Sequence, residues 1–168
     1  MNTAEISSAL GALLAELVDG ASKEGGYMLN PGDEGLLRSL EKLSAADASA
    51  LTATGSSIAA HVDHIRYGLS LMNRWGQGEN PFGSADWKES WKRTKVSEKE
   101  WQQRIAELRA EAARWLGVVR TPREVDEDGL KGLMGSIAHL AYHLGAVRQI
   151  KQATRGPVEG DGKVESRK

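Results

Sequence analysis

All four histidines of this chain lie in two short stretches of its 168 residues. One stretch is His61-Val62-Asp63-His64, and the other is His139-Leu140-Ala141-Tyr142-His143. Residues four apart share one face of an α-helix, with Cβ atoms about 5–6 Å apart, so His139 and His143 can reach one metal ion. An imidazole from His61 on a facing helix would complete a set of three ligands. Three protein ligands with one position left for water are typical of a catalytic metal site.

The alternative is that these histidines are ordinary core residues held by hydrogen bonds. Both stretches fall among apolar residues at helical spacing, so the side chains are expected on the inward faces of their helices. Each buried imidazole has two ring nitrogens that need partners, and the inward faces offer few polar groups. A metal ion satisfies three such nitrogens at once. The sequence therefore favours a site for one divalent ion, and nickel, zinc or iron suits nitrogen ligands.

Three glycines share the predicted histidine faces, namely Gly68, Gly132 and Gly135. Glycine within a helix costs about 0.5–1 kcal/mol relative to alanine, so several on one face need a reason. They indicate either a close approach of two helices or space for a ligand beside the ion.

Four long segments carry apolar residues every three or four positions, which predicts amphipathic helices. They are expected to cover residues 3–20, 56–75, 97–117 and 126–150, and a short helical turn is expected over residues 36–44. No segment has the alternation of a β-strand. The sequence therefore predicts an all-α fold, a four-helix bundle over residues 1–153, followed by a polar, mobile tail over residues 154–168.

Several residues mark where these helices begin. Thr3, and either Ser56 or Ser57, are suitable N-caps, and Ser97 with Glu100 forms a capping box. Acidic residues 126–128 suit the positive end of the last helix.

Two connections are less regular. Residues 44–55 are rich in Ala, Ser and Thr, and their helical content is open. The connection between the second and third long helices is long for a bundle, and Ser84 is expected to cap a short helix that carries Trp87 and Trp91. Lysines between these tryptophans suggest a platform for single-stranded nucleic acid, but packing of the tryptophans under the connection is the favoured interpretation.

Composition excludes several classes of function. The net charge is −1, so neither nucleic acid nor an acidic membrane is an expected partner. The chain has no cysteine, so any thiol must come from a cofactor or substrate. No apolar run approaches the ~20 residues of a membrane span, and the N-terminal residues do not resemble a signal peptide. We therefore expect a cytoplasmic protein whose partner is a small molecule.

The histidine-bearing segments resemble those of the DinB-like (YfiT-type) metal-binding four-helix-bundle family. The resemblance extends over about residues 5–152 and is specific only at Ile58-Ala59-Ala60-His61-Val62 and at His139-Leu140-Ala141-Tyr142-His143-Leu144-Gly145. It implies one divalent ion held by His61, His139 and His143, with no fixed place for His64. It also implies a thiol-dependent transferase or isomerase that uses glutathione, mycothiol or bacillithiol, and a homodimer.

Three functions follow as hypotheses. In the first, the protein is an S-transferase in which the ion binds a low-molecular-weight thiol and lowers its pKa, with His64 as a proton shuttle. In the second, it is a metal-dependent hydrolase with bound water as the nucleophile. In the third, it is a non-catalytic stress protein that binds a metal or a small ligand.

Overall fold

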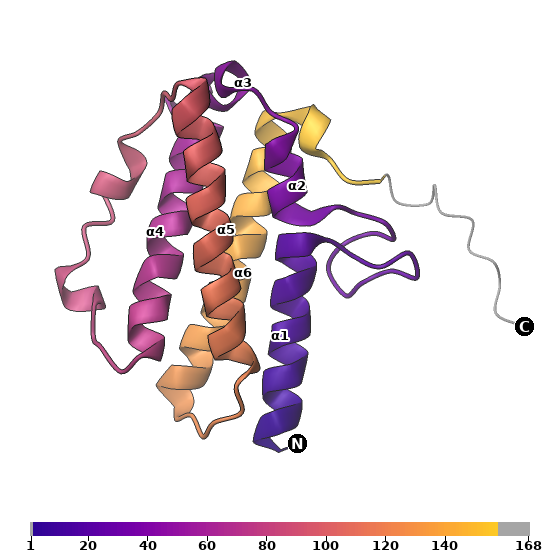
Figure 1. Cartoon of the computed structure of the whole chain (residues 1–168), viewed down its shortest axis with the longest axis vertical. Helices are drawn as coiled ribbons and strands as arrows, with labels where there is room; N and C mark the ends of the chain where they lie inside the picture. The colour runs from indigo at the N-terminus through magenta and orange to yellow at the C-terminus, as the bar shows by residue number, and fades with distance from the viewer. Residues whose placement is uncertain (1, 158–168) are drawn as a thin grey trace, which may run out of the picture.

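A computed structural model describes residues 2–157 of the chain, and this part is helical (Figure 1). Four helices are long: α1 (Thr3–Asp19), α4 (Ile58–Gly76), α5 (Glu98–Arg120) and α6 (Glu127–Ile150). The shorter helices are α2 (Gly35–Glu41), α3 (Ala45–Ser49) and the 3-10 turns η1 (Phe82–Ser84), η2 (Glu89–Trp91) and η3 (Gln152–Thr154). Between residues 2 and 157 there is no strand, only an isolated bridge between Ser22 and Gly25. The all-α prediction is confirmed.

Most of the predicted helix starts lie where the sequence placed them. The side chains of Ser57, Ser97 and Asp126 accept hydrogen bonds from the first turns of α4, α5 and α6, and Ser97 forms the predicted capping box with Glu100. The predicted cap of the first helix is wrong by one residue. Asn2 caps α1, because its side chain forms a reciprocal pair with Glu5.

The end of α5 also differs from the prediction. The helix continues past Gly117 to Arg120, and Val119 in this last turn is buried. Burial of one more apolar side chain outweighs the helix-breaking tendency of Gly117. The helix then ends immediately before Thr121-Pro122, since the residue before proline disfavours the helical conformation.

The irregular connections contain less helix than expected in one place and more in another. Residues 45–49 form the short helix α3, with a capping box between Ser44 and Asp47. The helix expected after Ser84 is absent: Ser84 ends η1, and only the single turn η2 follows. Neither 3-10 turn has a side-chain cap, which is consistent with their length.

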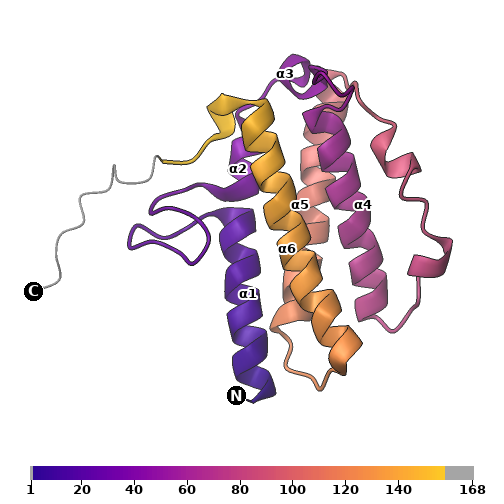
Figure 2. The same ribbon diagram turned by 180° about the vertical axis from the view of Figure 1, so that it is seen from behind.

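The four long helices pack in a closed arrangement in which α4 and α1 each contact both α5 and α6. Seen from behind, α6 lies between α1 and α4 (Figure 2). The colours in Figure 1 show that α1 and α6 run upward whereas α4 and α5 run downward. Because α4 and α5 are parallel, residues 77–97 must return along the whole length of α4. We call this segment the strap.

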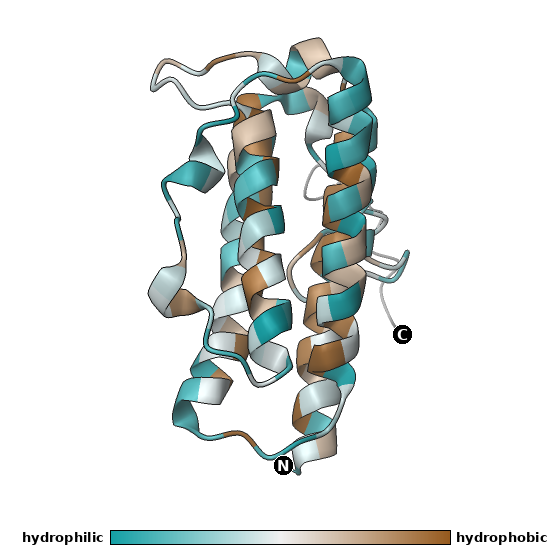
Figure 3. Ribbon diagram, turned by 60° about the vertical axis from the view of Figure 1, so that its left-hand side comes forward, coloured by the Kyte–Doolittle hydropathy of each residue, from teal (hydrophilic) through white to brown (hydrophobic). Residues whose placement is uncertain are grey.

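Hydrophobic residues recur along each long helix (Figure 3) and supply a core that includes the fully buried Trp101 and Trp115. Each indole nitrogen has a partner: Trp101 donates to the Leu43 carbonyl at 2.8 Å, and Trp115 donates to Ser136 Oγ at 3.0 Å. These bonds remove the penalty of burying an N–H group. The helices that carry the histidines are therefore held by a well-packed core.

The predicted tail begins within η3, where Thr154 is buried. Asn30 donates a hydrogen bond to the carbonyl of Pro157 at 2.9 Å. The rest of the predicted tail, residues 158–168, lies outside the described residues. Within residues 2–157, no helix is both long and apolar enough to cross a bilayer.

Candidate metal centre

The four histidines meet at one place between α4, α6 and the strap. His61 and His64 come from α4, three residues apart, and His139 and His143 come from α6. Three of the side chains are buried and His139 is partly exposed at the rim. The expectation that two distant stretches of sequence converge is therefore confirmed.

Three imidazoles present the same ring nitrogen to one point. His139 Nε2 lies 3.1 Å from His64 Nε2 and 3.0 Å from His143 Nε2. Ligand atoms of these three residues all lie within 4.8 Å of one another. Two nitrogens bound to one ion at about 2.0–2.1 Å lie about 2.9–3.4 Å apart at octahedral or tetrahedral angles. The two separations at His139 Nε2 match that range.

Hydrogen bonding alone does not account for this arrangement. A ring nitrogen carries either one N–H or one lone pair in its plane, so it makes a single in-plane hydrogen bond. His139 Nε2 has two nitrogen neighbours at hydrogen-bond distance, and it can satisfy only one of them. A cation accepts lone pairs from all three nitrogens at once. The donor set therefore fits a metal ion better than it fits a network of core histidines.

In two of these rings, Nδ1 contacts a residue outside the converging set. His64 Nδ1 lies 2.8 Å from Ser90 Oγ on the strap, and His143 Nδ1 lies 2.9 Å from His61 Nδ1. Metal-binding histidines commonly use their other ring nitrogen in this way, because such a bond fixes the tautomer and the ring orientation. Ser90 and His61 thus position His64 and His143 with Nε2 pointing inward.

Aromatic rings from the strap cover the histidines. Trp91 stacks on His64, with ring centroids 4.3 Å apart and an interplanar angle of 24°, and contacts His61 edge-on at 5.0 Å. Trp87 lies 5.7 Å from His64. These contacts support the prediction that the two tryptophans pack under the connection.

The three glycines have different surroundings. A Cβ on Gly68 would lie in ordinary contact with His139 and Trp87, at 3.7 and 3.8 Å. A Cβ on Gly132 would approach the Trp75 ring at 3.2 Å, so this glycine permits close packing of α6 on α4. Gly135 has no described atom within 4 Å of such a Cβ. Only Gly68 lies beside the histidines.

Burial keeps the four imidazoles neutral. It lowers the pKa of His64 to about 4 and that of His143 to about 3, and in both cases the neighbouring histidines lower the pKa further. Burial also lowers the pKa of His61 and of His139. Neutral imidazole is the form that binds metal, so near pH 7 the site needs to release no protons before an ion binds.

The structure distributes the predicted roles differently from the sequence. The predicted ligand set was His61, His139 and His143, with His64 as a proton shuttle. All four come together, but the three Nε2 atoms that converge belong to His64, His139 and His143. His61 instead faces the opposite nitrogen of His143. No pattern in the sequence points to Ser90, because its contact with His64 depends on the path of the strap.

Comparison of the chain with protein-family models, with curated proteins and with solved structures finds no match in any of the three. Function is therefore inferred from the geometry of the site itself.

Proposed function

We propose that this protein binds one divalent metal ion through Nε2 of His64, His139 and His143. The observation that carries the proposal is the pair of short contacts at His139 Nε2, which hydrogen bonding cannot satisfy together. Two residues outside the set, His61 and Ser90, hold the rings in place. Nickel, zinc and iron are the candidate ions for three neutral nitrogen ligands.

We further propose membership of the DinB-like four-helix-bundle family and activity as a thiol-dependent S-transferase. The support is the pattern of histidines on the second and last long helices, which resembles that family. A bound divalent ion would supply positive charge that lowers the pKa of a small thiol. The chain has no cysteine of its own to occupy the position that three ligands leave open.

The chain's own residues would handle the proton and the substrate. The thiol loses its S–H proton to a neighbouring base, and its sulfur then bonds to the electrophilic carbon while the leaving group departs with its electron pair. His61 is the imidazole that this ligand set leaves over, so it takes the proton-transfer role that the sequence assigned to His64. Trp87 and Trp91 would wall an apolar pocket for the electrophile.

Metal analysis of untagged protein tests the metal site, and the expected result is one ion per chain. Glutathione, mycothiol and bacillithiol, added separately to cobalt-substituted protein, test the transferase. A sulfur-to-metal charge-transfer band and thiol-dependent turnover of an electrophile are expected. Metal without either response would favour the hydrolase or the non-catalytic protein, and absence of metal would overturn the site itself.

The homodimer remains a proposal that accompanies the family resemblance, and the cytoplasmic location remains a proposal from the composition of the sequence. Light scattering after gel filtration measures the mass in solution. The expected mass is twice the chain mass of 18.2 kDa.

A further inference from the structure

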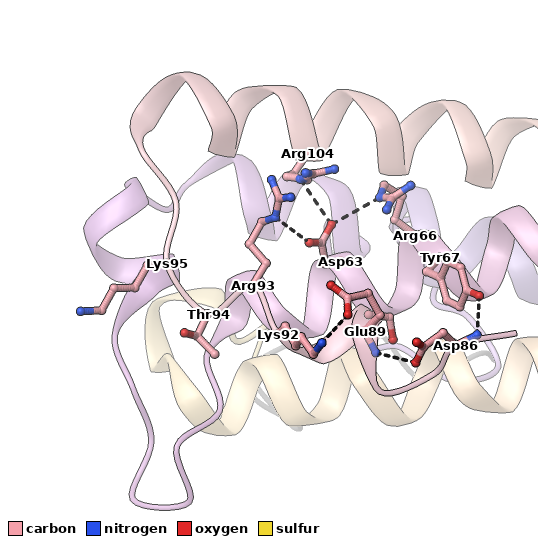
Figure 4. A pocket seen from close by; sticks show the side chains of 11 residues that line it. Asp63, Arg66, Tyr67, Asp86, Glu89, Lys92, Arg93, Thr94, Lys95 and Arg104 are labelled. Atoms are coloured by element: carbon pink, nitrogen blue, oxygen red, sulfur yellow. Dashed lines mark hydrogen bonds and ion pairs between the residues drawn. The ribbon is translucent and has the colours of Figure 1, made fainter.

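A second polar site lies on the other side of the strap from the histidines. It is a cavity of about 600 Å³ between α4, the start of α5 and the strap (Figure 4). This volume falls within the range of about 300–1,000 Å³ that small-molecule pockets occupy. Ser90 lines the cavity and also contacts His64, so the two sites share this one residue.

The cavity has an excess of positive charge. Five cationic and three acidic side chains line it, and the cations are Arg66, Lys92, Arg93, Lys95 and Arg104. Lys92 forms an ion pair with Glu89. Lys95 has no acidic partner within the described part of the chain. The chemical complement of this lining is an anion with one or two negative charges.

A buried carboxylate orients three of these cations. Asp63 lies within 3.4 Å of Arg66 Nε, 3.2 Å of Arg93 Nε and 3.3 Å of Arg104 Nε. Its side chain is only 10% exposed. Figure 4 shows the three guanidinium groups gathered around it. Because each guanidinium meets Asp63 most closely through Nε, its terminal nitrogens remain for other acceptors.

Arg93 is the least engaged of the three arginines. Arg104 also donates to Glu107 at 2.8 Å, and Arg66 approaches Glu107 at 3.6 Å. Among residues 2–157, Asp63 is the only acidic partner of Arg93, whose terminal nitrogens have no hydrogen-bond acceptor there. Its side chain is 45% exposed, so an incoming ligand can reach it.

The cations come from two parts of the molecule. Arg66 lies on α4 and Arg104 on α5, whereas Lys92, Arg93 and Lys95 lie on the strap. An anion held among them would tie the strap to the helices. The same strap brings Ser90 and Trp91 onto the histidines, so the anion would stabilise the cover of the candidate metal centre.

We propose that this cavity binds a small oxyanion, a carboxylate or a phosphate group, through the guanidinium groups oriented by Asp63. Planar guanidinium groups match the oxygens of either group by paired hydrogen bonds. This site requires no metal, so the proposal does not depend on the function proposed above.

The test is calorimetric titration of metal-free, full-length protein with inorganic phosphate and, separately, with succinate, at an ionic strength matched with sodium chloride. Metal-free protein is used because either anion could otherwise bind an ion at the histidines. Saturable binding at one site per chain is expected for at least one probe. The probe that binds more tightly identifies the ligand as phosphate-bearing or carboxylate-bearing.

Arg93→Ala is expected to weaken binding by about tenfold, because it removes a charged donor. Arg109→Ala is the matched control: this arginine is exposed, pairs with Glu41 and lies outside the cavity, so the variant loses the same charge and should bind as the unmodified chain does. His139→Ala should also retain the anion, although it is expected to lose the metal. Absence of saturable binding, or equal losses in Arg93→Ala and Arg109→Ala, would overturn the proposal.

Discussion

Two neighbouring residues of α4, Asp63 and His64, belong to two sites that accommodate a buried polar group in opposite ways. The strap buries both polar groups. On the His64 side the groups are kept uncharged, because burial lowers the imidazole pKa values and no carboxylate among residues 2–157 raises them. On the Asp63 side three arginine side chains surround the carboxylate and compensate its charge.

Because of this difference in charge, the two sites are expected to bind different kinds of ion. A cluster of neutral lone pairs without a counter-charge attracts a cation, whereas guanidinium groups with unused donors attract an anion. One turn of α4 can contribute a residue to each site, because side chains at adjacent positions point about 100° apart around the helix axis. Substitutions on either side of α4, and a change of pH, test whether the two sites are separate.

The largest effect is expected for His139→Ala. His139 Nε2 is the nitrogen that both other ligands approach, so its removal should weaken metal binding by more than the 10–100-fold (about 1–3 kcal/mol) loss typical of an outer partner. Metal content after dialysis, and the rise in melting temperature on adding zinc or nickel, measure this loss. Full metal content in the variant would contradict the histidine site.

The next prediction compares the two histidines of α4. His64→Ala should lose metal as completely as His139→Ala does, because it removes a converging nitrogen. His61→Ala should weaken metal binding by about 10–100-fold, as expected for a residue that orients a ligand without binding the ion itself. The metal dissociation constants of the two variants show whether His64 or His61 is the ligand from α4. The reverse order would restore His61 to the ligand set that the sequence predicted.

Asp63→Asn should act on the other side of α4. Loss of the negative charge leaves three guanidinium groups without their shared counter-ion, so we expect the free energy of unfolding to fall by about 1–3 kcal/mol. Urea unfolding measures the change. Metal stoichiometry should stay at the value for the unmodified chain, and a joint loss of metal would show that the two sites are not separate.

Acid should weaken the metal-free protein through the histidines. The pKa of His64 is about 4 and that of His143 about 3 in the folded state, against an ordinary value of 6.5 in the unfolded chain. Between pH 6.5 and about 4 the unfolded state therefore binds more protons, so stability is present above pH 6.5 and falls as the pH is lowered. Urea unfolding across this range should show the fall. A variant with both His64 and His143 replaced by Gln should show a smaller one.

The smallest effect is expected for Gly135→Ala. This glycine is exposed on α6, and no described atom lies within 4 Å of a Cβ placed there. Alanine should raise the free energy of unfolding by about 0.5–1 kcal/mol, because it restricts the unfolded chain and favours the helix. Thermal unfolding measures the gain, and metal content should not change. A loss of metal would place Gly135 at the site, as one interpretation of the sequence had it.

The positions of the helices and the convergence of the histidines could be predicted from the sequence alone. Local patterns suffice for both: the apolar spacing selects helix, and Ser97 and Asp126 satisfy free amide groups within their own first turns. The placement of two histidine stretches on inward faces then requires only that the helices pack. The error at Asn2 was also local, since either of two adjacent polar residues could have served as the cap.

Which imidazole nitrogens lie close together could not be predicted, because it depends on how the helices pack. His61 and His64 lie on the same half of α4, and the rotation of that helix against α6 selects the imidazole that faces His139. The path of the strap, set by two parallel helices, brings Ser90 to His64 and Arg93 to Asp63 across 26 and 30 residues. Such contacts depend on the packing of whole helices, which no short-range spacing in the sequence encodes.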